Sequence, residues 1–260
     1  MSDKNQDLRA TLLAFGGTLL GLGLGAIGFQ YLILADFIAE LSPAPAGLPA
    51  RALWATLAGL ALVIAGVAIV VRARLRTAAL ALAALLFLIL VALHVPNVIA
   101  KPASGGAWTP AMELLALGGA ALMLLGMTGG DSRLVLIGRR CFGVTLPVFG
   151  LLHFVYHDYV ASVIPSWIPA PQFWAYFTGL AHVAAGLAIV TGVRARLASV
   201  LLGLMFGSWV LIRHLPRVAA ALNSRPEWTS LFVATAMCGS AWLVVASLTR
   251  ERERPLEYHS

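Results

Sequence analysis

Long hydrophobic runs, separated by short stretches of charge and proline, make up most of the chain. Eight of these runs have 16 or more residues, which approaches the length that an α-helix needs to cross the hydrocarbon core of a bilayer. We predict spans at Ala10–Ala35, Ala52–Val71, Thr77–Leu93, Ala111–Met127, Cys141–Tyr156, Phe173–Val193, Leu197–Ile212 and Ser230–Leu248. The pattern therefore predicts an all-α, polytopic membrane protein whose main partner is the lipid bilayer.

Composition supports this class and excludes others. Of the 260 residues, 60% are apolar and 11% are charged, whereas a soluble domain carries about 25% charged residues. A soluble enzyme, a secreted disulfide scaffold and a disordered protein are therefore excluded. The two cysteines, Cys141 and Cys238, form no CxxC motif, so a thiol–disulfide oxidoreductase is not indicated either.

The basic residues indicate the orientation in the membrane. The net charge is +7, but the arginines cluster between the hydrophobic runs and form no basic face with exposed aromatic residues, so no nucleic-acid partner is predicted. With a cytoplasmic N-terminus, thirteen lysines and arginines lie on the inner side and five on the outer side. The positive-inside rule then predicts both termini in the cytoplasm and a multi-pass protein of the bacterial inner membrane.

The two halves of the chain resemble each other. Residues 49–70 and 169–190 are identical at 13 of 22 positions with an offset of 120. The same offset pairs the His-x-Pro motifs that begin at His94 and His214. Near the start of each half, Phe-Gly-x-Thr at 15–18 pairs with the same motif at 142–145, with an offset of 127.

This similarity predicts an internal duplication. We expect one four-helix repeat at residues 10–129, a second at residues 136–249, and a cytoplasmic tail at residues 250–260. Because each repeat has an even number of spans, both enter the membrane from the same side, as two parallel four-helix bundles packed side by side. Gly17, Gly21 and Gly25 form a small-xxx-small stripe, which we interpret as helix packing within the chain, with a homo-oligomer contact as the alternative.

Three histidines of the second repeat are the main candidates for chemistry. His153 and His157 are four residues apart, a spacing that places both rings on one helix face. His182 lies midway along the sixth span, and all three are expected in the outer half of the membrane. The offsets above pair them with Ala26, Gln30 and Leu62 of the first repeat, so the fold itself does not require histidine at these positions.

Three explanations of these histidines remain open. They are buried residues bonded to tyrosine or backbone, or they line a site for a quinone-like ligand, or they bind copper, zinc or haem iron. In the last case His153, His157 and His182 are the metal ligands. The full candidate ligand-binding set is His153, His157, His182, Tyr156, Asp158, Trp167 and Trp174.

Other polar residues have simpler expected roles. His94 and His214 occur in both repeats and are interpreted as structural. Glu113 is expected to pair with Lys101 or an outer arginine, and Arg213 is expected to extend to the membrane surface. The proline-rich loop at residues 165–171 is expected to cap the histidine cluster.

The second repeat resembles the DoxX-like family of small bacterial membrane proteins. The resemblance lies in Gly150-Leu151-Leu152-His153-Phe154, the loop Val163–Pro169, Phe177-Thr178-Gly179-Leu180-Ala181-His182, Ala185–Ile189 and the turn Arg194–Ala198. It implies a four-helix membrane unit, here in tandem. It also implies a link to quinone-coupled sulfur oxidation or oxidative-stress complexes, although His182 occupies a position that is usually acidic.

Together these observations predict a non-catalytic accessory or small-ligand-binding membrane component with a periplasm-facing histidine pocket. The cofactor is left open between a quinone and a metal or haem, and membrane redox proteins are the candidate partners. Two alternatives stay open: a small-solute transporter with its path between the repeats, and a copper- or haem-binding membrane redox protein. No catalytic residue is indicated.

Overall fold

The computed structural model describes residues 2–38 and 41–251, and every regular element in this part of the chain is helical. The expected cytoplasmic tail at residues 250–260 falls almost entirely outside the described residues. The helices are α1 (Ser2–Leu34), α2 (Arg51–Val70), α3 (Leu75–Ile89), η1 (Leu90–His94), α4 (Val95–Ala100), α5 (Gly105–Gly129), α6 (Ser132–Val155), α7 (His157–Ser162), α8 (Pro171–Thr191), α9 (Ala195–Trp209), η2 (Val210–His214), α10 (Leu215–Ala220) and α11 (Arg225–Glu251).

Eight helical segments of the described chain are long and apolar enough to cross a membrane, which confirms the predicted number of spans. The third and seventh spans are longer than expected, at 26 residues each, because each continues through a π-helical turn into a further short helix. Pro96 and Pro216 follow these turns. Proline lacks an N–H and disrupts the regular hydrogen-bond ladder, and the wider π turn accommodates that break without ending the span.

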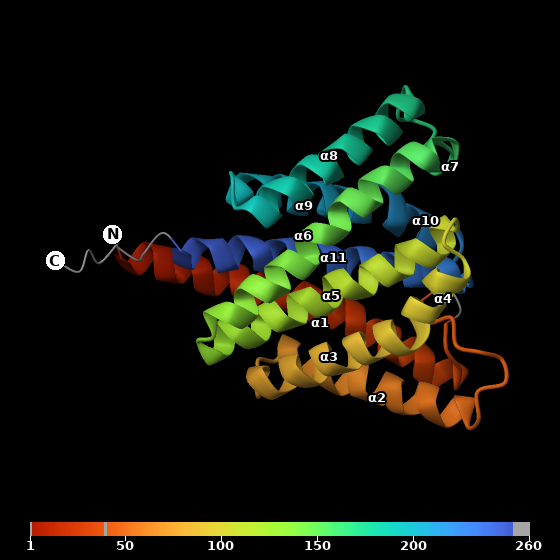
Figure 1. The fold of residues 1–260 in the computed structure, drawn as a ribbon, viewed down its shortest axis with the longest axis horizontal. Helices are drawn as coiled ribbons and strands as arrows, with labels where there is room; N and C mark the ends of the chain where they lie inside the picture. The colour runs from red at the N-terminus through yellow and green to blue at the C-terminus, as the bar shows by residue number, and fades with distance from the viewer. Residues whose placement is uncertain (1, 39–40, 252–260) are drawn as a thin grey trace.

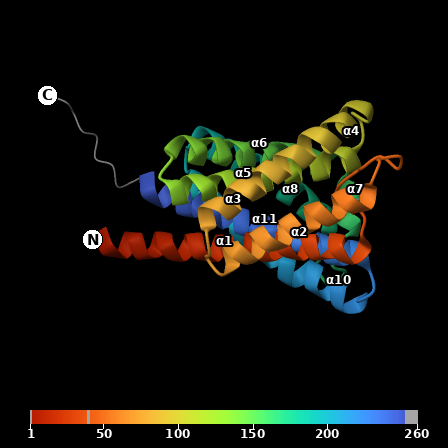
Figure 2. The same cartoon turned by 90° about the horizontal axis from the view of Figure 1, so that it is seen from below.

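The eight spans form one closed ring. Around the bundle the neighbours follow the order α1, α2, α3, α5, α6, α8, α9, α11 and back to α1, and α5 also contacts α11 across the middle (Figure 1). Figure 2 shows α4, α7 and α10 together at the end away from the N-terminus, and we call this the distal end.

This packing differs from the expected pair of separate four-helix bundles. The first and last spans of each half, α1 with α5 and α6 with α11, contact each other only weakly. Instead, the last span of each half packs along the first span of the other half, as α11 on α1 and α5 on α6. The last span of each half therefore packs with the other half, so that the eight spans form one body. Helices α5 and α11 form its buried centre.

Glycines allow close contact where α11 crosses α1 and where α5 crosses α6. A Cβ on Gly239 of α11 would lie 2.6 Å from the carbonyl oxygen of Gly16 on α1, and a Cβ on Gly138 would collide with the carbonyl of Gly119. Only glycine allows the two backbones to approach this closely, so both crossings are specified by small residues. The predicted stripe on α1 also packs within the chain, since Gly21 and Gly25 both face Gly66 of α2.

The glycine contacts also show which residues of the two halves occupy corresponding positions. Gly21 meets Gly66 and Gly28 meets Gly59, and in the second half Gly143 meets Gly186 and Gly150 meets Gly179. The second members of these pairs differ by 120 and the first members by 122, so the short match with an offset of 127 is not the structural register. His153 therefore corresponds to Tyr31 rather than Ala26, and His157 to Ala35 rather than Gln30. The duplication stays a prediction, which these recurring contacts support.

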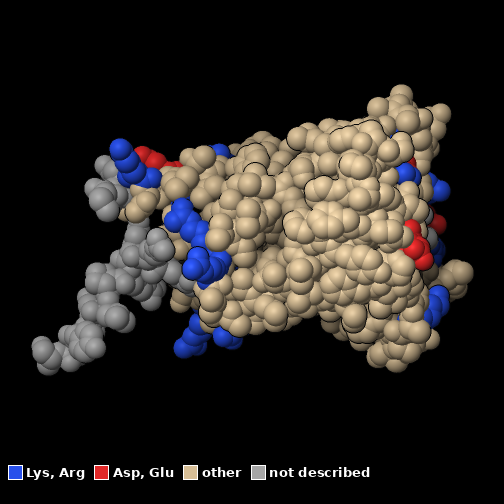
Figure 3. Space-filling model, turned by 90° about the horizontal axis from the view of Figure 1, so that it is seen from above, with Lys and Arg blue, Asp and Glu red and all other residues tan. Residues whose placement is uncertain are grey.

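Charged side chains lie at the two ends of the molecule, with a broad uncharged belt between them (Figure 3). Many large apolar side chains on this belt are exposed, including Leu57, Ile64, Leu88 and Leu211. Such a surface is stable in lipid and not in water, because lipid tails solvate it without cost. The chain is thus a multi-pass membrane protein in a bilayer environment.

Candidate functional site

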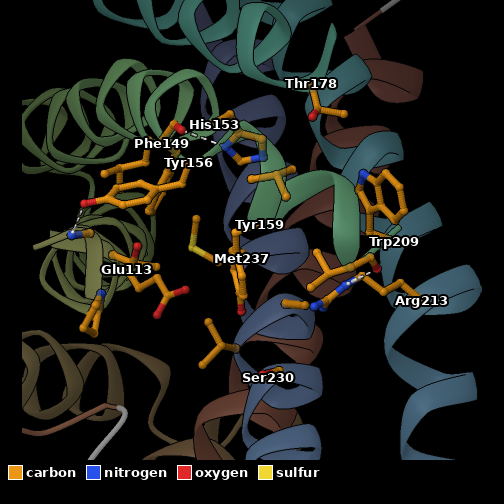
Figure 4. A pocket seen from close by; sticks show the side chains of 18 of the residues that line it. Glu113, Phe149, His153, Tyr156, Tyr159, Thr178, Trp209, Arg213, Ser230 and Met237 are labelled. Atoms are coloured by element: carbon orange, nitrogen blue, oxygen red, sulfur yellow. Dashed lines mark hydrogen bonds between the residues drawn. The ribbon is translucent and has the colours of Figure 1, made fainter. Parts of the chain in front are cut away.

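A cavity of about 760 Å³ lies in the distal part of the molecule, between helices of the second half and α5 of the first half. Its walls come from α5, α6, α8, α9, η2 and α11, and residues 159–164 of α7 and the following turn border it (Figure 4). The lining is mostly apolar, with a small number of polar side chains. We call this cavity the pocket.

His153 and His182 lie together on the pocket wall, with their ring centroids 4.9 Å apart. Each ring donates from Nδ1 to a carbonyl of its own helix: His153 to Phe149 at 2.8 Å, and His182 to Thr178 at 2.7 Å. These bonds make Nδ1 the protonated nitrogen, so each Nε2 is an acceptor in the neutral ring. Phe149 and Phe206 flank His182 at centroid distances of 6.1 and 5.7 Å, which gives this wall an aromatic surface.

His157 does not join the pair. Helix α6 ends at Val155, and Tyr156 has φ −110° and ψ 34°, so the helical spacing between residues 153 and 157 is broken. His157 instead stacks on Tyr176 at 5.3 Å, and its Nδ1 lies 3.3 Å from Oε1 of Gln172. The expectation that the two rings share a helix face is therefore wrong, because the helix stops between them.

The other predicted site residues are divided between the pocket and the surface. Tyr156 lines the pocket, and its hydroxyl donates to Ala103 O and accepts from Gly105 N, both at 2.9 Å. Asp158 is exposed and accepts a hydrogen bond from Gln172 at 2.8 Å. Trp167 is 69% exposed, and Trp174 donates to the carbonyl of Pro169.

Trp167 and Trp174 do not line the pocket, and neither does any residue of the 165–171 loop. The segment just before this loop borders the pocket instead.

The predicted metal ligands do not converge. Within residues 2–38 and 41–251, no group of three or more histidine, cysteine, aspartate and glutamate side chains has metal-binding geometry. His153 and His182 offer two Nε2 atoms, while His157 faces Gln172 on the surface. The geometry thus suits a hydrogen-bonded ligand better than a three-histidine metal centre.

Two pocket residues were given other roles by the sequence reasoning. Glu113 of α5 turns its carboxylate into the pocket (Figure 4), and it has no hydrogen bond or ion pair with any described residue. The expected pairing with Lys101 or an outer arginine is not formed; the nearby acid that does pair is Glu227, with Arg217 at 2.6 Å.

Arg213 also lines the pocket, where its Nε donates to the carbonyl of Val163 at 3.3 Å. A comparison of the halves at an offset of 120 would have singled out both residues, because Leu93 corresponds to Arg213 and Val233 to Glu113.

The fold and pocket define the class of the protein: an α-helical, multi-pass membrane protein with an internal cavity of ligand size. Residues 134–214, less than half of the chain, match the family model described as DoxX. The matched region runs from α6 to η2 and includes His153, His182 and Arg213. No curated protein and no solved structure gives a significant match to the chain.

Proposed function

We propose that the protein is a non-catalytic membrane component that binds a small amphipathic, quinone-like molecule in the pocket. The observation that carries this proposal is the His153–His182 pair, in which both Nδ1 atoms are bonded to backbone and both rings line a mostly apolar cavity. Because the two rings are held in place by their own helices, they present a preorganised pair of acceptors.

The size and chemistry of the pocket support this class of ligand. Ligand cavities typically have volumes of about 300–1,000 Å³ and combine apolar walls with few polar groups. The pocket has about 760 Å³, which accommodates a substituted ring with part of its tail. Phe149, Phe206 and Trp209 offer ring faces, and the imidazoles offer acceptors for a hydroxyl group.

Charged groups on the other walls add a second recognition element. Glu113 contributes an acceptor or, when protonated, a donor, and Arg213 contributes donors that suit a carbonyl oxygen. A ring that carries both hydroxyl and carbonyl oxygens can satisfy these opposed groups at once. A purely apolar molecule would leave them without partners, and that costs binding energy.

The depth of the pocket favours binding over transport. Its lining ends at Glu113 of α5 and Met237 of α11. Further toward the end that holds the N-terminus, the same two helices carry buried apolar residues such as Leu117, Leu124 and Leu243. A small polar solute would have to displace this packed core to cross. In the predicted orientation the pocket faces the periplasm of a bacterial inner membrane, where a redox partner would exchange the ligand.

The proposal is tested by identifying what the purified protein carries. Lipids are extracted from the protein and from a His153→Tyr, His182→Leu variant, which introduces the corresponding first-half residues, and both extracts are analysed by mass spectrometry. We expect a ring-bearing amphipathic molecule in near-stoichiometric amount, reduced at least about tenfold in the variant, because two hydrogen bonds are lost.

The matched control is His157→Ala, which alters a histidine outside the pocket and should leave the ligand content unchanged. Equal content in the wild type and the double variant would contradict the proposal. Elemental analysis of the same samples tests the metal alternative, for which copper, zinc or iron would have to fall in the double variant.

A further inference from the structure

One segment of the chain has two different positions in the two halves. With the offset of 122, residues 36–43 correspond to residues 158–165, and the pairs include Asp36 with Asp158, Phe37 with Tyr159 and Pro43 with Pro165. Both segments follow the end of the first span of their half, and both lie at the distal end.

In the first half, Phe37 and Leu41 of this segment are part of the core. Phe37 is 8% exposed and Leu41 is 5% exposed, and the ring of Phe37 packs edge-on against Tyr31 with a centroid distance of 5.7 Å. The carbonyl of Leu41 accepts a 2.6 Å hydrogen bond from Nε2 of His94, which is fully buried. We call this arrangement the seated position.

In the second half the segment is displaced from that position. Tyr159, the counterpart of Phe37, is 68% exposed, and Val163, the counterpart of Leu41, is only half-buried. The carbonyl of Val163 accepts from Nε of Arg213 instead of from His214, the counterpart of His94. Arg213 also covers the histidine, because its Nη1 lies 3.1 Å from Nδ1 of His214.

Arg213 therefore contacts both the Val163 carbonyl and His214, the two groups that would have to bond to each other if the second half matched the first. In the first half the corresponding residue is Leu93, which cannot donate to a carbonyl, and there His94 reaches Leu41 directly. Arg213 and Tyr159 both line the pocket (Figure 4).

We propose that Arg213 is a positioning residue that holds residues 159–164 at the border of the pocket and out of its interior, and that these residues act as a plug which fills the pocket when seated. This inference rests on the proposed function only in taking the pocket as the binding site. When the plug is seated, Tyr159 packs on His153 as Phe37 packs on Tyr31, and the Val163 carbonyl accepts from Nε2 of His214.

The segment has defined hinges for such a movement. At its start, Tyr156 is fixed by its hydrogen bonds to Ala103 and Gly105, and helix α6 already ends there. At its end, Pro165 corresponds to Pro43 of the first half. Seating buries apolar surface, whereas the unseated position keeps a charge-assisted hydrogen bond, so the two contributions oppose each other and a ligand that binds one position better shifts the balance.

The test measures exposure of the plug in purified protein without added ligand. Cys141 and Cys238 are replaced by alanine, Tyr159→Cys is introduced as the single cysteine, and its rate of labelling by a water-soluble maleimide is recorded. We expect fast labelling in this parent and labelling at least about tenfold slower after Arg213→Leu, because a seated residue 159 becomes reactive only when the plug opens.

Three further variants separate positioning from general structural damage. Phe37→Cys gives the slow limit of a seated residue, and Trp167→Cys, outside the plug, should label equally fast with and without Arg213→Leu. Adding His214→Leu to Arg213→Leu removes the donor for the seated position and should restore fast labelling of Tyr159→Cys.

Equal labelling of Tyr159→Cys with and without Arg213→Leu would overturn the inference, and so would a parent rate as slow as that of Phe37→Cys. If Arg213→Leu does not yield folded protein, Leu93→Arg tests the same idea in the first half, where it should speed the labelling of Phe37→Cys; an unchanged rate would overturn it. Because no ligand is present, these outcomes are independent of whether the pocket binds a quinone.

Discussion

The two halves of this protein share a helix pattern but differ at their distal ends. In both halves the third span contains a π turn before a proline, and Trp108 and Trp228 donate to carbonyls six residues earlier, each at 2.9 Å. The first half closes its distal interior with buried side chains, whereas the second half leaves a pocket of about 760 Å³. The pocket therefore comes from side chains and from one displaced segment rather than from the helix arrangement.

Several positions at which the halves differ lie on the pocket wall. Five second-half residues, each given after its first-half counterpart, are Tyr31 and His153, Leu62 and His182, Leu86 and Phe206, Ile89 and Trp209, and Leu93 and Arg213. Four of these changes place an aromatic or basic side chain where the first half has an aliphatic one. Polar and ionisable groups are costly in a membrane interior, so their gathering on one side of an otherwise matched structure indicates a site.

The largest effect on stability is expected at the close helix crossings made by glycine, a feature that both halves share. Gly138→Ala places a Cβ against the backbone carbonyl of Gly119, which cannot move aside as a side chain can, so the helices must separate. We expect a loss of about 3 kcal/mol in unfolding free energy, measured by denaturant titration in detergent.

Gly16→Ala at the equivalent crossing should cost a similar amount, because its Cβ would lie 2.8 Å from the carbonyl of Gly239. Gly17→Ala is the matched control, since its Cβ would meet only a side-chain carbon of Ile69 at 3.6 Å. If neither Gly138→Ala nor Gly16→Ala changes the unfolding free energy, these contacts do not stabilise the packing of α11 on α1 and of α5 on α6.

The next prediction concerns Leu62 and His182, which occupy corresponding positions; each is replaced by the residue of the other half. Leu62 is 2% exposed in the closed half, so Leu62→His buries an imidazole in a filled core, and we expect a loss of about 2 kcal/mol. His182→Leu should leave stability within about 1 kcal/mol of the wild type, because the pocket wall becomes more apolar. Both are measured by the same titration, and equal losses for the two variants would contradict the contrast between a filled core and an open pocket.

A smaller effect is expected at the first-half hydrogen bond that secures the seated segment. The Tyr31 hydroxyl lies 2.5 Å from the Ser42 hydroxyl, and both groups are buried. Tyr31→Phe leaves the Ser42 hydroxyl unsatisfied and should cost about 1 kcal/mol by thermal or chemical denaturation. Tyr159→Phe, in the exposed counterpart segment, should have no measurable effect; a loss as large as that of Tyr31→Phe would indicate that the plug is seated.

The smallest prediction concerns pH and the loop after α1. The guanidinium of Arg51, 2.5 Å from Asp36, holds the pKa of that carboxyl below its usual value. A lowered folded-state pKa stabilises the protein above the unfolded value of about 3.9, and this contribution is lost as the pH falls through the folded pKa. Asp36→Asn should therefore flatten the decline of the melting temperature below about pH 5.

The matched control for this prediction is Asp158→Asn, at the corresponding position of the second half. Asp158 accepts from the amide of Gln172 and lies 3.1 Å from Nδ1 of His157, in place of the guanidinium that binds Asp36. This variant should change the pH profile less than Asp36→Asn does. If Asp36→Asn keeps the wild-type profile, the Asp36–Arg51 pair does not contribute to stability.

Part of the site could be predicted from sequence and part could not. The pairing of His153 with His182 was expected, because both lie on apolar spans where imidazoles are rare. His157 was placed with them because a helix was assumed to continue, and the break at Tyr156 carries no proline or glycine to signal it. The segments 36–43 and 158–165 match at an offset of 122, but the four-residue motif at an offset of 127 is the more conspicuous match in the sequence and points to the wrong register.

Hydropathy alone determined that this chain crosses a bilayer eight times as helices, since no other backbone arrangement of such runs satisfies its hydrogen bonds in lipid. The short motifs of the second half also indicated the resemblance to DoxX. Which helices pair was decided by tertiary structure, because both halves carry small residues on several helices and only the packed bundle selects the partner. The pocket was decided in the same way: the Leu41 carbonyl accepts from His94, whereas the Val163 carbonyl accepts from Arg213, and this difference is visible only in three dimensions.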